Sequence, residues 1–147
     1  MESEPVEFRE GESGPVHAGD PIRRMKAYRL ALEVVDVAWA DAATVRTHPT
    51  TAFIASQLYR SASSIGANGC DGYSRSSGKD RVRFFEYALS SARECRFWYH
   101  AARHVLERAD YEQRTVLLTR ICQILLKAIP QERDRDIRPD PPAGAEQ

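Results

Sequence analysis

Arginine, lysine and tyrosine side chains gather where two predicted helices meet, and their chemistry suits nucleic acid. Guanidinium and ammonium groups bind phosphate oxygens, and a tyrosine ring stacks on a base. We therefore predict nucleic-acid contacts for Arg60, Tyr73, Arg75, Lys79, Arg81 and Arg93. Arg93, Arg96 and Arg103 also share a broad side of one predicted helix, as a basic stripe for a phosphate backbone would. The alternative is structural, because this segment must also end one helix, start the next and solvate its surface.

Aromatic residues between positions 84 and 99 are too numerous for one helix face to bury. We expect some of them, Phe84, Phe97 and Trp98, to point away from the core. Exposed apolar patches of this kind usually mark protein interfaces. The sequence therefore predicts that the chain associates with itself through these three residues.

Catalytic and metal-binding patterns are missing from the sequence. His100 and His104 are four residues apart and could share a metal, but no HExxH or paired Glu-x-x-His motif accompanies them. No G-x-S-x-G motif, phosphate-binding loop or nucleophile–base pair is present. We predict a non-enzymatic protein with no catalytic residue, no metal site and no cofactor.

Charge is divided unevenly along a chain whose formal net charge is zero. Residues 1–20 carry six acids and one arginine, whereas residues 21–130 carry 17 basic and 10 acidic residues. A basic body with acidic ends points to an anionic partner. The three cysteines are far apart, which argues against a disulfide framework or a zinc site. With no apolar signal segment and no run of 18 apolar residues, we expect a cytoplasmic protein with no membrane partner.

Hydrophobic periodicity predicts an all-α fold, an antiparallel up-down four-helix bundle over residues 21–131. The helices are expected at about 21–45, 50–73, 79–108 and 110–130, with disordered tails at 1–20 and 132–147. Asp20 and Asp110 are expected to cap the first and fourth helices, and Pro130 to end the fourth. The core stripe of the first helix is predicted from gaps of three and four between apolar residues. Its members are Met25, Tyr28, Leu32, Val35, Trp39 and Ala42.

The other three stripes follow the same rule. They comprise Ile54, Leu58, Ala62, Ile65 and Gly69 in the second helix; Phe85, Ala88 or Leu89, Ala92, Cys95, Tyr99, Ala102 and Leu106 in the third; and Leu117 or Leu118, Ile121, Leu125 and Ala128 or Ile129 in the fourth. The second helix is rich in small residues, which let another helix approach closely.

Three blocks between Ser56 and Leu106 resemble the bacterial four-helix-bundle family of 23S rRNA intervening-sequence proteins. The family's usual order is Q-L-x-R-A-x-x-S-I, then A-N-I-A-E-G-Y-x-R, then an F-x-x-x-x-x-x-S-A-x-E block. The matching residues are Gln57-Leu58-Tyr59-Arg60-Ser61 with Ser64-Ile65, then Ala67-Asn68-Gly69-Cys70-Asp71-Gly72-Tyr73-Ser74-Arg75, then Phe84 or Phe85 with Ser91-Ala92-Arg93-Glu94. The chain departs from the pattern at Gly69, Cys70 and Asp71, where an aliphatic residue, Ala and Glu are usual.

The resemblance implies a bundle that assembles as a ring-like homopentamer. Relatives of the family include the accessory variability determinant of diversity-generating retroelements, whose ring binds nucleic acid and a reverse transcriptase through a basic surface. The resemblance thus implies RNA or DNA, and a reverse transcriptase, as candidate partners. The leading hypothesis is an oligomeric, RNA-associated adaptor. The alternative is a protein–protein interaction scaffold with no nucleic-acid role.

Overall fold

The computed structural model describes residues 19–133, and all regular structure in this range is helical. The elements are the 3₁₀ turn η2 (Pro21–Arg24), α1 (Lys26–Arg46), α2 (Ile54–Ser74), α3 (Gly78–Ala102), the 3₁₀ turn η3 (Arg103–Val105) and α4 (Arg108–Arg133). The predicted tails fall mainly on residues 1–18 and 134–147, which lie outside the described residues. Within residues 19–133, no helix is long and apolar enough to cross a membrane.

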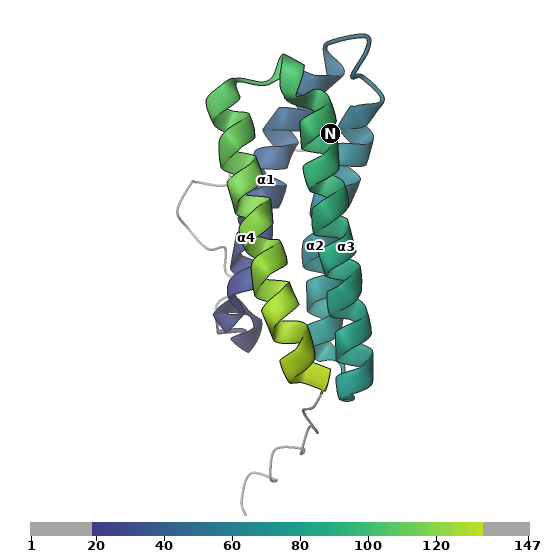
Figure 1. The fold of residues 1–147 in the computed structure, drawn as a ribbon, viewed down its shortest axis with the longest axis vertical. Coiled ribbons are helices and arrows are strands. Elements are labelled where there is room, and N and C mark those ends of the chain that lie inside the picture. The colour runs from purple at the N-terminus through teal and green to yellow at the C-terminus, as the bar shows by residue number, and fades with distance from the viewer. Residues whose placement is uncertain (1–18, 134–147) are drawn as a thin grey trace, which may run out of the picture.

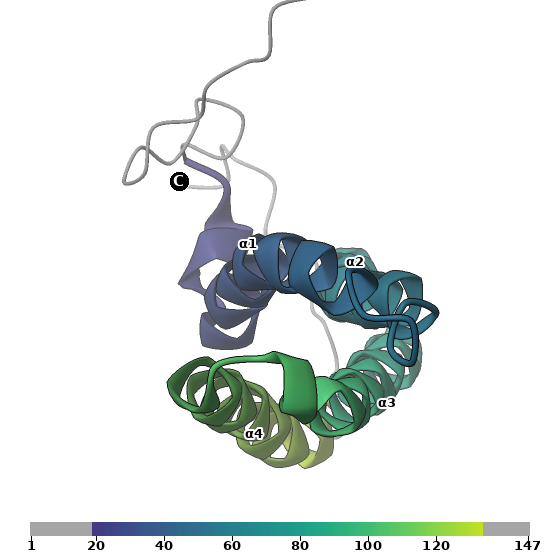
Figure 2. The ribbon, with the colours of Figure 1, turned by 90° about the horizontal axis from the view of Figure 1, so that it is seen from above.

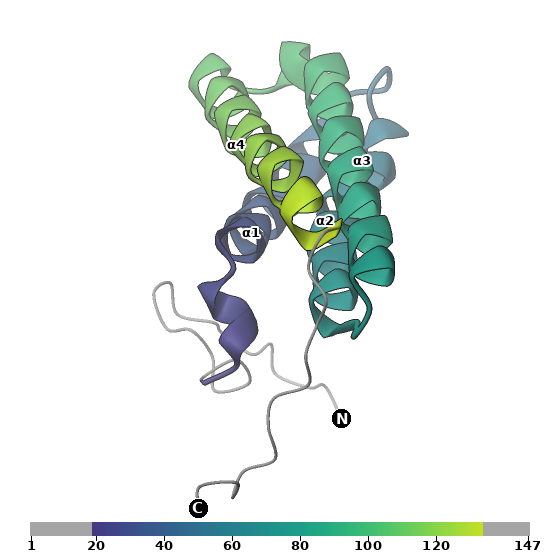
Figure 3. The same ribbon diagram turned by 60° about the horizontal axis from the view of Figure 1, so that its bottom comes forward.

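Consecutive helices lie side by side, which confirms the predicted all-α up-down bundle (Figures 1 and 2). α2 packs against both α1 and α3, and α3 packs against α4. α1 and α4 complete the bundle, but their shared interface is the smallest of the four. α4 is inclined to α3, so that the two helices diverge toward the end where η3 connects them (Figure 3).

The core stripes predicted for α2, α3 and α4 are confirmed, apart from two half-buried members, Leu106 and Ala128. The buried residues comprise Ile54, Leu58, Ala62, Ile65 and Gly69 in α2; Phe85, Ala88, Leu89, Ala92, Cys95, Tyr99 and Ala102 in α3; and Leu117, Leu118, Ile121, Leu125 and Ile129 in α4. Burial raises the pKa of Cys95 to about 12, so this thiol stays protonated at neutral pH.

The core stripe predicted for α1 is wrong in its central part. Leu32 and Val35 are only half-buried, and Trp39 is 70% exposed. The buried face is instead built largely from small residues: Ala27, Tyr28, Ala31, Val34, Ala38, Asp41, Ala42 and Val45. Both sets of residues have helical spacing. α2 packs so close to α1 that the face with the alanines fits between the two helices, and the face with the larger residues does not.

The boundaries of α1 and α2 also differ from the predicted ones. Asp20 caps the 3₁₀ turn η2 rather than α1, because its Oδ1 accepts a hydrogen bond from the Ile22 amide at 3.0 Å. Met25 then has an extended backbone, and the turn buries Ile22 before α1 begins at Lys26. α2 begins at Ile54 rather than near position 50. The Thr51 hydroxyl donates to the Val45 carbonyl at 2.8 Å, which closes the turn after α1 instead of capping α2.

The predicted third helix is six residues too long, since α3 ends at Ala102 and η3 leads into α4. Asp110 lies in the first turn of α4 rather than before it, and α4 continues past Pro130 to Arg133. Two ion pairs join this last turn to α3, Glu132 to Arg81 at 3.0 Å and Arg133 to Glu86 at 3.6 Å. They help the helix to continue past a proline that lacks one hydrogen-bond donor.

A buried polar network joins three of the four helices. Asp41 of α1 accepts hydrogen bonds from the Tyr99 hydroxyl of α3 and from Arg114 Nε of α4, both at 2.8 Å. Burial, together with the nearby Asp41 carboxylate, raises the pKa of Tyr99. The α1–α4 interface is the smallest of the four helix interfaces, and this network adds a polar link that holds α4 against α1.

Two glycines of α2 have contrasting surroundings. A Cβ added at Gly72 would lie 2.7 Å from Cε1 of the buried Phe85 ring, closer than real Cβ contacts. A Cβ added at Gly66 would lie 3.7 Å from Ala31 Cβ, which is an ordinary contact. Gly72 is therefore required by the packing of α3 on α2, whereas Gly66 is not required by its contacts.

We predict that Gly72→Ala lowers the free energy of unfolding by about 1–3 kcal/mol, because the Phe85 ring must move. Gly66→Ala is the matched control in the same helix, and it should raise that free energy by up to about 1 kcal/mol through helix propensity. Urea unfolding followed by circular dichroism measures both. A Gly72→Ala protein as stable as Gly66→Ala would contradict the predicted clash.

Candidate nucleic-acid interface

The six residues predicted to contact nucleic acid lie in three separate places. Arg60 is in the first half of α2, four others surround the α2–α3 turn, and Arg93 is in the middle of α3. Arg60 and Tyr73 are about 20 Å apart along the axis of α2. Arg60 is also paired across the surface, since its guanidinium lies 2.9 Å from Glu94 and 2.6 Å from Gln57. The six residues therefore do not form one site.

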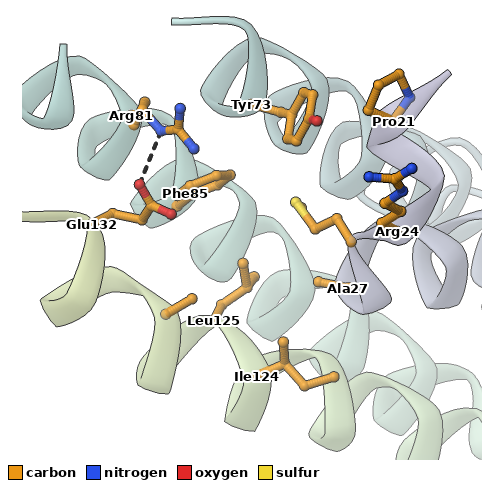
Figure 4. A pocket seen from close by; sticks show the side chains of 11 residues that line it. Pro21, Arg24, Ala27, Tyr73, Arg81, Phe85, Ile124, Leu125 and Glu132 are labelled. Carbon is orange, nitrogen blue, oxygen red and sulfur yellow. Dashed lines mark ion pairs between the residues drawn. The ribbon is translucent and has the colours of Figure 1, made fainter. Parts of the chain in front are cut away.

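The group at the α2–α3 turn is itself divided. Tyr73 and Arg81 line a cavity at the end of the bundle opposite η3, and Arg81 forms an ion pair there with Glu132 (Figure 4). Arg75 lies over the Phe84 ring, with its Cζ 4.7 Å from the ring centroid, and Lys79 is exposed. Arg81 is thus a poor candidate for a surface phosphate contact, because its side chain is 15% exposed and faces a carboxylate.

A basic groove lies between α3 and α4, in the half of the bundle where these helices diverge. It is an open depression of about 400 Å³, and we define it by its lining residues: Arg93, Arg96, Phe97, His100, Tyr111 and Thr115. Its α3 members recur at spacings of three and four, so they share one face of the helix. Its α4 members come from the first two turns of α4.

The electrostatics of the basic groove favour an anion. No carboxylate is among its lining residues, and Glu94 of the same helix turns away to pair with Arg60. Arg96 reaches α4, where it donates to the Thr119 hydroxyl at 3.2 Å. Burial raises the pKa of the Cys122 thiol, and the nearby guanidiniums of Arg96 and Arg93 act in the opposite direction.

Aromatic rings complete the basic groove. Phe97 is 59% exposed, so most of its ring is available to a partner. The His100 Nδ1 atom lies 3.2 Å from the Tyr111 hydroxyl oxygen, which joins the two walls of the groove. Proteins that bind single-stranded nucleic acid use exposed rings to stack on bases and neighbouring guanidiniums to contact phosphates.

The basic groove was partly visible in the sequence. Of the predicted basic stripe, Arg93 and Arg96 line the groove, whereas Arg103 lies in η3, where it donates to the His100 carbonyl at 2.9 Å, and is not among the lining residues. Tyr111 and Thr115 were missed, because their place in the groove depends on how α4 docks on α3.

The three predicted interface residues have different environments. Phe84 is half-buried beneath Arg75 and Arg83. Trp98 is half-buried, with its indole nitrogen donating to Glu94 at 3.2 Å. Trp98 also makes edge contacts with the rings of Phe97 and Phe53, with centroids 5.2 and 6.4 Å apart. We call Phe53, Phe97 and Trp98 the aromatic patch, and Phe53 is the member that the sequence did not reveal.

A second aromatic pair lies between α1 and α2. The rings of Trp39 and Tyr59 are in edge contact, with centroids 5.6 Å apart. Trp39 was missed as a surface residue because its spacing placed it in the predicted core stripe. No group of three or more metal-binding side chains is found within residues 19–133.

Comparisons with known proteins identify the family of this chain. Residues 23–127 match the profile of the 23S rRNA-intervening sequence proteins. A solved structure from Bacteroides thetaiotaomicron, described as a protein of unknown function from the S23 ribosomal protein family, is 23% identical. The similarity covers 70% of this chain and 97% of that one, with a TM-score of 0.65, and it supports the shared fold. No curated protein matches the sequence. Because the family profile covers most of the chain, the protein belongs to the 23S rRNA-intervening sequence protein family.

Proposed function

We propose that this protein is a non-enzymatic, oligomeric adaptor that binds RNA in the basic groove. The observation that carries the proposal is the convergence of Arg93, Arg96 and Phe97 in one depression whose lining has no carboxylate. The guanidiniums would hold phosphates, and the Phe97 ring would stack on a base. The family name refers to 23S rRNA, which makes RNA the first nucleic acid to test. A reverse transcriptase, suggested by the retroelement resemblance, is a candidate protein partner of the same adaptor.

The six residues predicted from the sequence contribute unequally to this proposal. Arg93 lies in the basic groove, and the exposed Lys79 and Arg75 are far enough from it to act only on a longer RNA. Arg60 and Arg81 are already paired with carboxylates, so we assign them no phosphate contact. Tyr73 lines a cavity, and we assign it no stacking role.

We expect the affinity for a single-stranded RNA oligonucleotide to fall steeply with salt, because each phosphate contact releases counterions. The double variant Arg93→Gln/Arg96→Gln should lower the slope of log K against log salt by about 1.4. The control is Arg120→Gln/Lys127→Gln, which removes two charges from exposed positions on the other side of α4. Fluorescence anisotropy over a salt series measures all three proteins, and thermal melting confirms that each is folded.

Equal salt slopes for the two double variants would contradict RNA binding in the basic groove, because the loss of net charge alone would then explain the change. Salt-insensitive binding, or none to RNA or DNA, would favour the protein scaffold instead.

The scaffold alternative rests on a separate observation, the exposed rings near one end of the bundle. Phe53 is 64% exposed and Trp39 is 70% exposed, which is unusual for rings of this size in a chain that acts alone. Self-association through Phe53 and Trp98 would leave the Phe97 ring to the basic groove, so it is compatible with both functions, and the resemblance implies a pentamer. The stoichiometry remains a prediction.

We predict that Phe53→Ala and Trp98→Ala shift the oligomer toward monomer, because each removes apolar area from the aromatic patch. Tyr87→Ala is the control, since Tyr87 is a 50% exposed ring elsewhere on α3. Sedimentation velocity at several concentrations gives the mass of each species. A wild-type monomer, or an oligomer that Tyr87→Ala weakens as much as the other two changes, would contradict the assignment.

A further inference from the structure

A cavity of about 260 Å³ lies at the opposite end of the bundle from η3. Residues from η2 and from all four helices contribute to its lining (Figure 4). It shares no lining residue with the basic groove. Any ligand that it takes would therefore contact none of the residues that line the basic groove.

The floor of this cavity is apolar. It is formed by Met25 and Ala27 of the α1 end, Phe85 of α3, and Ile124 with Leu125 of α4. Phe85 and Leu125 are buried, and Ile124 is half-buried against the core. An apolar floor of this kind suits a short hydrocarbon chain or a ring.

The rim of the cavity is polar and carries more positive than negative charge. Arg24 and Arg81 are at opposite sides of the lining, and Glu132 is the one carboxylate among the lining residues (Figure 4). Glu132 is 3.0 Å from Arg81 Nε, so that carboxylate is already matched by one guanidinium. Arg24 is exposed, and within residues 19–133 it makes no ion pair or side-chain hydrogen bond. The unmatched charge at the rim is therefore the guanidinium of Arg24.

The size of the cavity limits the ligand. Sites for drug-sized molecules have volumes of about 300–1,000 Å³, whereas an apolar cavity of about 150 Å³ already holds benzene. A volume of about 260 Å³ lies between these limits and, scaled from benzene, suits a molecule of roughly ten non-hydrogen atoms.

We propose that this cavity is a binding site for a small amphipathic carboxylate, such as a short fatty acid or an arylalkanoic acid. The hydrocarbon part would lie on Phe85, Leu125 and Ile124, and the carboxylate would accept hydrogen bonds from Arg24. The Tyr73 ring lines the same cavity and adds a hydroxyl donor to it. A bound carboxylate would link η2 to α4. It would thereby strengthen the contact between α1 and α4, whose helix interface is the smallest of the four.

Three probes with the same six-carbon chain separate the head-group preference from apolar burial: hexanoate, hexan-1-ol and hexylamine. The full chain is titrated with each probe by isothermal calorimetry, and methyl NMR shifts of Met25 and Ile124 locate the site. We expect hexanoate to bind at least about tenfold more tightly than hexan-1-ol, because its hydrogen bonds are charge-assisted. Hexylamine should bind more weakly than the alcohol, because it places a cation beside Arg24.

Arg24→Gln should reduce the affinity for hexanoate to about that for hexan-1-ol, while the affinity for the alcohol stays unchanged. Lys26→Gln is the control, since Lys26 is an exposed cation two residues away that does not line the cavity. Both changes are at exposed positions, so the fold is expected to survive. The proposal is overturned if no probe binds, if the shifts lie outside the cavity, if hexylamine binds as tightly as hexanoate, or if Lys26→Gln has the effect of Arg24→Gln.

Discussion

α1 and α2 pack closely against each other through small side chains. Alanines form much of the buried face of α1, and Gly66 of α2 faces Ala31 at a distance that leaves room for one methyl group. Helices that meet through such small residues leave no space for large side chains between them. Trp39 is consequently on the surface, where it meets Tyr59. The small residues that pack the core therefore also create part of the exposed aromatic surface.

The position of α4 is controlled in a different way. Its interface with α1 is small, and the buried Asp41 carboxylate joins the two helices through Arg114, with Tyr99 of α3 as a third member. Breaking a buried ion pair of this type costs about 3–5 kcal/mol, far more than losing a surface pair. The inclination of α4 opens the basic groove on its α3 side at one end, and the carboxylate-free lining of that groove follows from the direction in which Glu94 points.

Much of the fold could be predicted from the sequence, because α2, α3 and α4 each have one clear apolar stripe. α1 has two overlapping stripes that spacing alone does not distinguish, and the one with the larger residues, favoured by residue size, is not the one that packs in the core. The site was less predictable. The common side of Arg93 and Arg96 is a local property of one helix, whereas the pairing of Arg81 with Glu132 joins the start of α3 to the end of α4. Contacts of this kind decide which cations are available, and they depend on tertiary structure.

Binding of RNA in the basic groove can be tested by photocrosslinking. An RNA that contains 4-thiouridine is bound to the full chain, irradiated, and the modified residues are mapped by peptide mass spectrometry. We expect adducts on Phe97 of α3 and Tyr111 of α4, which line the groove from its two helices. Adducts confined to Tyr73 at the α2–α3 turn, or to Trp39 and Tyr59 between α1 and α2, would overturn RNA binding in the groove.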